Sequence, residues 1–455
     1  MRERGRDLIV AWFRRMGLDE VAYHQATVVG RDDDHPGRAL DYYGSRGETP
    51  LRWGGDGVAR LGLTGEVTPE AYEAAFGPDG FRHPATGRRL VTTRRPGFEL
   101  VVGAHKSVAV LGVIGHEDAM HSILDVETAA TMRWLDDWFQ ARGGRRGRAQ
   151  VRTATGGLTY AVTRHATSRA GDPSPHDHVL VANIVEMLDD SGGYKALDSG
   201  TLADTVEAAT MVGRLHAAAR AVELGSDIAP DDGPSGNLRH WRIVGIPQDV
   251  CQLFSKRSDE ISEHLAETGH RSYRARGVAA RSTRSAKRHT GADQLLPGWH
   301  AELDAAGWPV PRLAAQLAAS QCRTRGLPFR LTTTEMEQLA GEVLDIEGNL
   351  LARHKVFTRM HLIADLAPRL YGRDPAELDR VLAHIVASRS VVPLIQVAGA
   401  REQSFTTAEV LTAEHTITRS IERLARRRGA RIDPERIAAA ITANEQAIGR
   451  ALTTG

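Results

Sequence analysis

The stretch RHATSRAGDPSPHDHVLVAN, from Arg164 to Asn183, is the part of the sequence that best indicates the fold. The residues from Leu158 to Thr167 and from His176 to Met187 both have the composition of β-strands. Between them, SRAGDPSP is rich in turn-forming residues. We therefore predict an antiparallel β-hairpin whose connection lies at 169–175.

Three histidines fall within this hairpin. Side chains alternate between the two faces of a strand, so His176 and His178 point the same way, and antiparallel pairing brings His165 to their face. Three neutral imidazoles from two adjacent strands leave open positions for water or substrate, as a catalytic metal requires. A lone histidine is more often a surface or core residue, but the HxH pattern opposite a third histidine reverses that preference. We predict a divalent metal site, with Mg, Mn or Zn as the candidate ions.

Tyr23, Tyr42 and Tyr43 lie in the first fifth of a chain that has eight tyrosines in all. A phenol, with its pKa near 10, becomes a useful nucleophile when a nearby metal-bound phosphate positions it and neutralises charge. Tyrosine together with a metal suggests phosphodiester transesterification. The competing interpretation of the adjacent pair is an aromatic face packed into the protein.

The composition is that of an ordinary globular protein. The 455 residues suffice for two to four domains, and 58 basic against 57 acidic residues give a net charge of +1, which favours no partner class. Cys251 and Cys322 stand far apart without a CxxC motif, so we expect neither disulfides nor a thiolate zinc site. No apolar run approaches the ~18 residues of a membrane span. A cytoplasmic protein without membrane contact is expected.

Positive charge is concentrated in two tracts that the total conceals. RGGRRGRAQVR, at 142–152, is expected to be a basic loop, and 270–290 contains seven basic residues and no acidic one. Such runs are usually solvated surfaces, but arginine is well suited to phosphate oxygens. The candidate DNA contacts are Lys106, Arg145, Arg146, Arg148, Arg274, Arg276, Arg281 and Arg284.

The remaining pattern predicts a mixed architecture. Residues 1–95 are loop-rich with short elements, GFELVV from Gly97 predicts a strand, and one or two long helices are expected from Lys106 to Trp138. A further helix is expected at about 201–223. Beyond a predicted boundary near 320 the chain becomes helical, with two helices and a strand of winged-helix proportions. We predict a domain at 1–320 and a smaller, mostly helical region at 321–455.

Three ordered motifs resemble the MobF family of conjugative relaxases, the TrwC and TraI type of HUH endonuclease. The histidine stretch resembles its third motif, including the spacing of eleven and two between the histidines. GFELVVGAHKSVAVL, from Gly97 to Leu111, resembles the second motif, in which the family usually has Asp where Glu99 stands. YYGSRGETPLRWGGDGVARLGLTGEV, from Tyr42 to Val67, resembles the segment after the catalytic tyrosines. The resemblance covers about residues 20–300.

The resemblance implies an α+β fold with a palm-like antiparallel sheet flanked by helices. It also implies a DNA relaxase in which His165, His176 and His178 hold the metal, and Glu99 orients a ligand or accepts the tyrosine proton. A tyrosine would attack single-stranded DNA, beside a hairpin at a transfer origin, and form a 5′-phosphotyrosyl adduct with strand transfer in conjugation. Relaxosome accessory proteins and a coupling protein are further implied partners.

The identity of the nucleophile stays open at this point. Tyr42 and Tyr43 match the second tyrosine pair of the family, and Tyr23 is the nearest candidate for the first, so we rank Tyr23 ahead of Tyr42. The short N-terminal strand of the family is not recognisable in MRERGRDLIVAWFRRMG.

Nucleotide binding is not expected. No lysine follows a glycine, so the GxxxxGK[ST] phosphate loop of relaxase helicases is missing, and we expect a truncated or split relaxase or a fragment. Two other functions compete with the relaxase hypothesis. One is a three-histidine hydrolase in which metal-activated water attacks, and the other is a decayed relaxase that only binds origin DNA.

Overall fold

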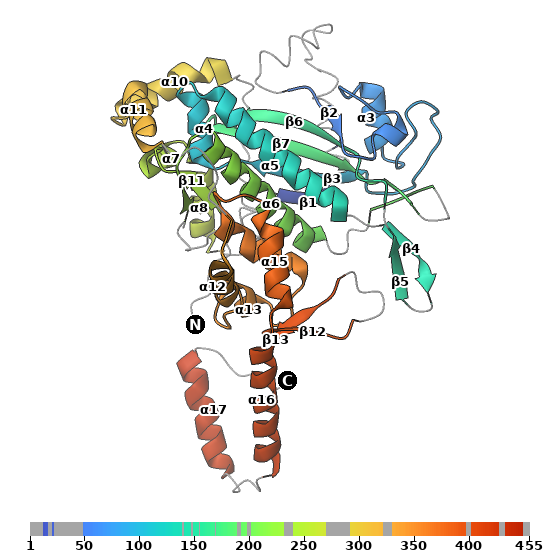
Figure 1. The fold of residues 1–455 in the computed structure, drawn as a ribbon, viewed down its shortest axis with the longest axis vertical. Coiled ribbons are helices and arrows are strands. Elements are labelled where there is room, and N and C mark those ends of the chain that lie inside the picture. Colours follow the sequence, from blue (N-terminus) through green and yellow to red (C-terminus); the bar gives the residue numbers. More distant parts are fainter. Residues whose placement is uncertain are drawn as a thin grey trace.

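The computed structural model describes most of the chain (Figure 1). The described residues are 12–16, 21, 49–138, 141–146, 149–153, 155–168, 170–188, 193–197, 202–231, 240–269, 292–321, 330–396, 402–426 and 433–448. None of the described helices is both long enough and apolar enough to cross a membrane.

A five-stranded antiparallel sheet forms the centre of the molecule, with the strand order β1-β3-β7-β6-β2. Its strands are β1 (Trp12–Arg15), β2 (Arg52–Gly54), β3 (Gly97–Gly103), β6 (Tyr160–Thr167) and β7 (Pro173–Ala182). The expected β6–β7 hairpin is present, although the second strand ends at Ala182 and is followed by a separate short strand. This arrangement confirms the predicted antiparallel sheet.

Helices cover one face of this sheet (Figure 1). They are α4 (Lys106–Val113), α5 (Glu117–Trp138) and α6 (Leu202–Glu223). The region predicted as one or two helices is two, because Gly115 adopts a left-handed φ of 88° between them. Apolar side chains of β3 and β7, among them Leu100 and Val179, pack against Leu124 and Met132 of α5.

The segment at 49–95 covers part of the opposite face. It contains η1 (Ala59–Leu61) and α3 (Pro69–Phe76), whose start is capped by a hydrogen bond from the Ala71 amide to the Thr68 hydroxyl. Tyr72 and Phe76 pack there against Leu180 of β7. The register of β6 and β7 places this apolar contact toward one end of the strands and the histidines toward the other.

Two sequence expectations about short strands were wrong. The N-terminal segment WFRR forms β1, which pairs with β3. The basic tract at 142–152 belongs to a hairpin of β4 (Ala141–Arg146) and β5 (Ala149–Thr153), whose register shifts between Arg142 and Arg145. Two glycines lie at this shift, where a β-bulge can accommodate them. The glycine-rich segment therefore still pairs as two antiparallel strands.

Further elements complete the structure. They are β8 (Val185–Glu186), β9 (Tyr194–Lys195), β10 (Ile228–Asp231), β11 (His240–Ile243), α7 (Gln248–Leu253), α8 (Lys256–Thr268), α10 (Ala292–Ala305), α11 (Val310–Ser320), α12 (Thr333–Val343), α13 (Asn349–Arg353), α14 (Arg359–Leu366), η3 (Ala367–Leu370), α15 (Glu377–Ala387), β12 (Val391–Pro393), β13 (Phe405–Thr407), α16 (Ala408–Arg426) and α17 (Pro434–Ile448).

The C-terminal region packs on α6 and shares its apolar core. Met211 and Leu215 of α6 belong to one buried cluster with Phe357, Leu366 and Ile385. Helices α14 and α15 precede the β12–β13 hairpin, which is the order expected of a winged-helix-like unit. The predicted domain boundary at residue 320 stays a prediction, because α6 packs into the apolar core of the sheet and into that of the C-terminal region.

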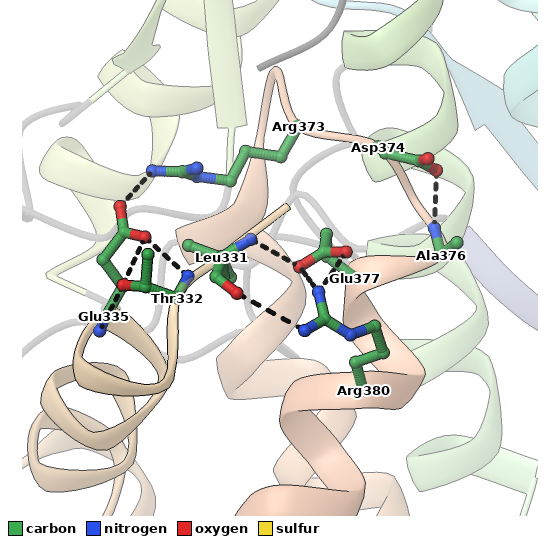
Figure 2. A network of polar contacts seen from close by, with 8 residues as sticks. All are labelled: Leu331, Thr332, Glu335, Arg373, Asp374, Ala376, Glu377 and Arg380. Carbon is green, nitrogen blue, oxygen red and sulfur yellow. Dashed lines mark hydrogen bonds and ion pairs between the residues drawn. The ribbon is translucent and has the colours of Figure 1, made fainter. Parts of the chain in front are cut away.

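A buried polar network fixes the start of α12 against α15 (Figure 2). The buried carboxylate of Glu377 accepts a hydrogen bond from the Leu331 amide at 2.9 Å and from Arg380 at 2.5 Å. Thr332 and Glu335 form a capping box on α12. Since Glu377 is thus satisfied, the network joins two helices without leaving its buried charge unpaired.

A buried acid between α5 and α6 predicts a pH-dependent stability. Burial raises the pKa of Glu127 from 4.5 to about 7, although Arg214, 3.9 Å away, opposes the shift. The folded protein then keeps a proton that the unfolded chain releases, so this group's contribution to the free energy of unfolding falls as the pH rises from about 4.5 to 7. We expect Glu127→Gln, which mimics the protonated acid, to gain about 1–3 kcal/mol relative to wild type between pH 5 and pH 8. Urea unfolding at both pH values measures this, and a constant difference between the proteins would contradict it.

Candidate metal centre

The three predicted histidines meet on one face of the sheet. In the register of β6 and β7, His165 lies directly opposite His176, and His178 follows on the same face. The ring centroids are 4.4–5.3 Å apart, and one ligand nitrogen from each ring lies within 4.8 Å of the others. Within the described part of the chain, no other group of three His, Cys, Asp or Glu side chains gathers this closely.

The surroundings of the rings favour metal binding through their Nε2 atoms. His165 is 6% exposed, whereas His176 and His178 are half-buried, so the cluster is accessible from one side. The Nδ1 atom of His176 lies 2.6 Å from the carbonyl oxygen of Ser174. A carbonyl only accepts hydrogen bonds, so this contact puts the His176 proton on Nδ1 and the lone pair on Nε2.

Glu99 reaches the same cluster from the neighbouring strand. Its partner in the β3–β7 ladder is Leu180, which places it on the histidine face, and its side chain is fully buried. The carboxylate Oε1 lies 2.5 Å from Nδ1 of His178. This hydrogen bond orients the ring and fixes its tautomer, as a carboxylate does for a metal-binding histidine.

The contact of Glu99 with His178 predicts weaker metal binding in Glu99→Gln. The substitution keeps the shape of the side chain but removes the charge behind the ring, so we expect the affinity for Mn²⁺ to fall about 10- to 100-fold. Calorimetric titration of metal-free protein measures the affinity. Glu377→Gln is the matched control, since it neutralises a buried glutamate of the C-terminal region, whose described partners are Leu331 and Arg380. Equal affinities of Glu99→Gln and wild type would refute the assigned contact.

Lys106 is the first residue of α4 and contacts the start of β7, the strand that carries His176 and His178. Its ammonium donates a 2.7 Å hydrogen bond to the carbonyl of Pro173, three residues before His176. Burial lowers the pKa of Lys106 to about 8, and the nearby Asp172 partly offsets this. The expected phosphate contact of Lys106 stays a prediction.

The structure describes the backbone of only two of the other predicted site residues. Arg145 and Arg146 belong to β4, on the hairpin after α5. The remaining ones lie outside the described residues: Tyr23, Tyr42, Tyr43, Arg148, Arg274, Arg276, Arg281 and Arg284.

Tyr72 is a residue near the site that the sequence did not single out. Its side chain is fully buried, and its hydroxyl donates a 3.1 Å hydrogen bond to the carbonyl of Val21. Burial raises the pKa of Tyr72 above 10, and the charge of Glu99 adds to this. Tyr72 is therefore a poor nucleophile, but it brings Val21 close to the face that carries Glu99. Its place in the helix PEAYEAAF gives only the signal of an ordinary core residue.

Comparison with known proteins agrees with this geometry. The family model described as TrwC relaxase matches residues 18–306. The chain belongs to the TrwC relaxase family. This confirms the family resemblance, and the matched segment includes the strands that carry all three histidines and Glu99.

Individual curated proteins also resemble part of the chain. The multifunctional conjugation protein TraI of Escherichia coli is 29% identical over 296 residues, and TraI of strain K12 is 29% identical over 293 residues. These alignments include 59% of this chain, which spans only 15% of the length of either TraI protein.

Solved TrwC structures share the fold. TrwC in complex with oriT DNA, in a metal-bound form, has 22% identity and a TM-score of 0.54, and the match covers 66% of this chain and 99% of that one. TrwC with a 27-mer DNA comprising the recognition hairpin and the cleavage site has 21% identity, the same TM-score and the same coverage. The predicted α+β fold is thereby confirmed.

Proposed function

We propose that this TrwC-family protein nicks one strand of DNA at a transfer origin and transfers that strand in conjugation. The observation that carries the proposal is the convergence of His165, His176 and His178 in a chain that belongs to the relaxase family. The protein would act in the cytoplasm on single-stranded DNA beside a hairpin. Relaxosome accessory proteins and a coupling protein are proposed as further partners.

The three histidines fit a divalent cation, and TrwC itself has been solved in a metal-bound form. When bound, such an ion supplies Lewis-acid polarisation of the scissile phosphate. His176 and His178 present Nε2 because Ser174 and Glu99 hold their Nδ1 protons. Mg, Mn and Zn remain the candidates; the all-nitrogen ligand set favours Mn or Zn over Mg by affinity.

A tyrosine oxygen would attack the phosphorus, form the 5′-phosphotyrosyl bond and release a 3′ hydroxyl. Tyr23 is the first candidate, and it follows Val21 by two residues. The carbonyl of Val21 accepts a hydrogen bond from Tyr72, whose pKa is raised in part by the nearby charge of Glu99. Tyr42 and Tyr43 are the alternatives. Because Glu99 is fully buried and hydrogen-bonded to His178, we assign it the orienting role in preference to accepting the tyrosine proton.

DNA contacts are proposed for the β4–β5 hairpin. A two-stranded ribbon fits the major groove of a duplex, and Arg145 and Arg146 belong to it. Lys106, Arg148, Arg274, Arg276, Arg281 and Arg284 are proposed as further phosphate contacts, in line with the affinity of arginine for backbone oxygens.

A strand-cleavage assay tests the proposed function. Labelled oligonucleotides from the genetic neighbourhood of the protein, carrying the hairpin, are incubated with and without Mn²⁺ and analysed on a denaturing gel. We expect metal-dependent cleavage of one strand, with the 3′-side fragment retarded because its 5′ phosphate is attached to the protein. Cleavage without attached protein would favour the metal-water hydrolase, and binding without cleavage of a proven origin would favour the decayed relaxase.

A further inference from the structure

The strands that carry the histidines have a second set of functional groups on their other face. Arg164 precedes His165, and Asp177 lies between His176 and His178. In the β6–β7 ladder, Arg164 lies directly opposite Asp177, and the next pair along the ladder is His165 opposite His176. The two charged residues therefore lie immediately behind the metal centre, toward α5.

This pair is closely hydrogen-bonded and buried. Arg164 donates from Nε to Asp177 Oδ1 at 2.7 Å and from Nη2 to Oδ2 at 2.8 Å, which is the bidentate geometry of a strong ion pair. Asp177 is 1% exposed and also accepts a 2.7 Å hydrogen bond from the hydroxyl of Thr128. Arg164 lies 2.8 Å from Asp125 as well. Thr128 and Asp125 belong to α5, so the network joins both strands to that helix.

The register of these strands needs such a constraint. The ladder is irregular between His165 and Thr167, directly beside the metal centre. A slip of one residue would move every side chain of a strand to the opposite face and separate His165 from His176 and His178. It would also detach Arg164 from Asp177 and leave a buried carboxylate without its cation, which is strongly unfavourable.

We propose that Arg164 and Asp177 are positioning residues of the metal centre. Their ion pair holds β6 and β7 in the one register that brings the three histidines together, and the contacts to α5 keep this hairpin at a fixed place on the helix. The proposal rests on the proposed function to the extent that the histidines bind a metal. The competing view is that the pair only adds stability, like any other buried ion pair.

The chain offers a matched control for that competing view. Asp365, in the C-terminal region, also pairs with an arginine, Arg369, and also accepts a hydrogen bond from a neutral donor, Asn349, at 2.6 Å. The side chains of Asp365 and Arg369 are 6% and 18% exposed, against 2% and 15% for Asp177 and Arg164. Asp177→Asn and Asp365→Asn therefore remove comparable buried charges, one behind the histidines and one away from them.

Metal binding separates the two views without any assay of activity. Metal-free wild type and both variants are titrated with Mn²⁺ by calorimetry, and their visible spectra are recorded with Co²⁺. We expect Asp177→Asn to bind Mn²⁺ about 10- to 100-fold more weakly than wild type and to show an altered Co²⁺ spectrum. Asp365→Asn is expected to bind within about twofold of wild type, since distant sites are usually independent. Urea unfolding shows whether the two variants lose similar stability.

Each outcome decides the proposal. Equal metal affinity and spectra of wild type and Asp177→Asn overturn it and leave the proposed function standing, whereas a wild type that binds no divalent cation overturns both. If Asp177→Asn does not fold, Arg164→Lys takes its place, because lysine keeps the charge but loses the bidentate fork. Weakened metal binding in that variant supports the proposal, and unchanged binding overturns it.

Discussion

His176→Ala is expected to lower metal-dependent strand cleavage about 100- to 10,000-fold. The substitution removes one of three converging imidazoles, and the charge stabilisation that a bound cation supplies at a phosphate amounts to several kcal/mol. Because His176 is half-buried on a strand whose apolar packing lies toward its other end, we expect little change in folding. Single-turnover cleavage of a hairpin oligonucleotide at saturating Mn²⁺ measures the loss.

A histidine elsewhere in the chain controls for this experiment. His384 is half-buried on α15, in the C-terminal region, and is not part of the histidine cluster. His384→Ala should cleave at the wild-type rate. Cleavage by His176→Ala at that same rate would show that the three histidines are not the metal centre of the reaction.

Tyr23→Phe is expected to abolish the covalent DNA adduct while leaving metal affinity unchanged. Phenylalanine keeps the ring but lacks the oxygen that would bond to phosphorus, so no slower version of the same step exists. Denaturing gels with a 3′-labelled oligonucleotide report the adduct, because the tyrosine keeps the 3′-side fragment through its 5′ phosphate, and calorimetry with Mn²⁺ reports the metal site.

The parallel variants Tyr42→Phe and Tyr43→Phe complete this test. If either of them loses the adduct while Tyr23→Phe retains it, the nucleophile is reassigned to that residue. Cleavage that persists in all three variants, with no adduct, would contradict tyrosine chemistry and support attack by water.

The histidine cluster was predictable from sequence because it depends on local rules. Strand alternation places His176 and His178 together, and the short connection to the preceding strand brings His165 across. The helical layer followed from the apolar periodicity of the segment from Lys106 to Trp138, where only the break at Gly115 was left open.

Other parts of the site depend on contacts between distant segments. The strand β1 has the sequence WFRR, whose two arginines hide its strand character, and it exists through pairing with β3 some 85 positions away. In the same way, the role of Asp177 requires Thr128 and Asp125 from α5, and that of Tyr72 requires Val21. No local pattern encodes these long-range partners.

The domain boundary predicted near residue 320 shows a similar limit of prediction from sequence. A change in composition near 320 suggests separate units, but the Ala-rich helix α6 contributes to the apolar clusters of both regions. A helix that is apolar on more than one side can be buried by two partners, and the sequence does not tell which segments supply them.

Mass spectrometry of the DNA adduct tests the central claim most directly. The protein is incubated with a hairpin oligonucleotide and Mn²⁺, digested with protease, and its tyrosine-containing peptides are analysed for an attached 5′ phosphonucleotide. A metal-dependent adduct on Tyr23, lost in His176→Ala, is the predicted result. Complete cleavage with every tyrosine peptide unmodified would contradict the account.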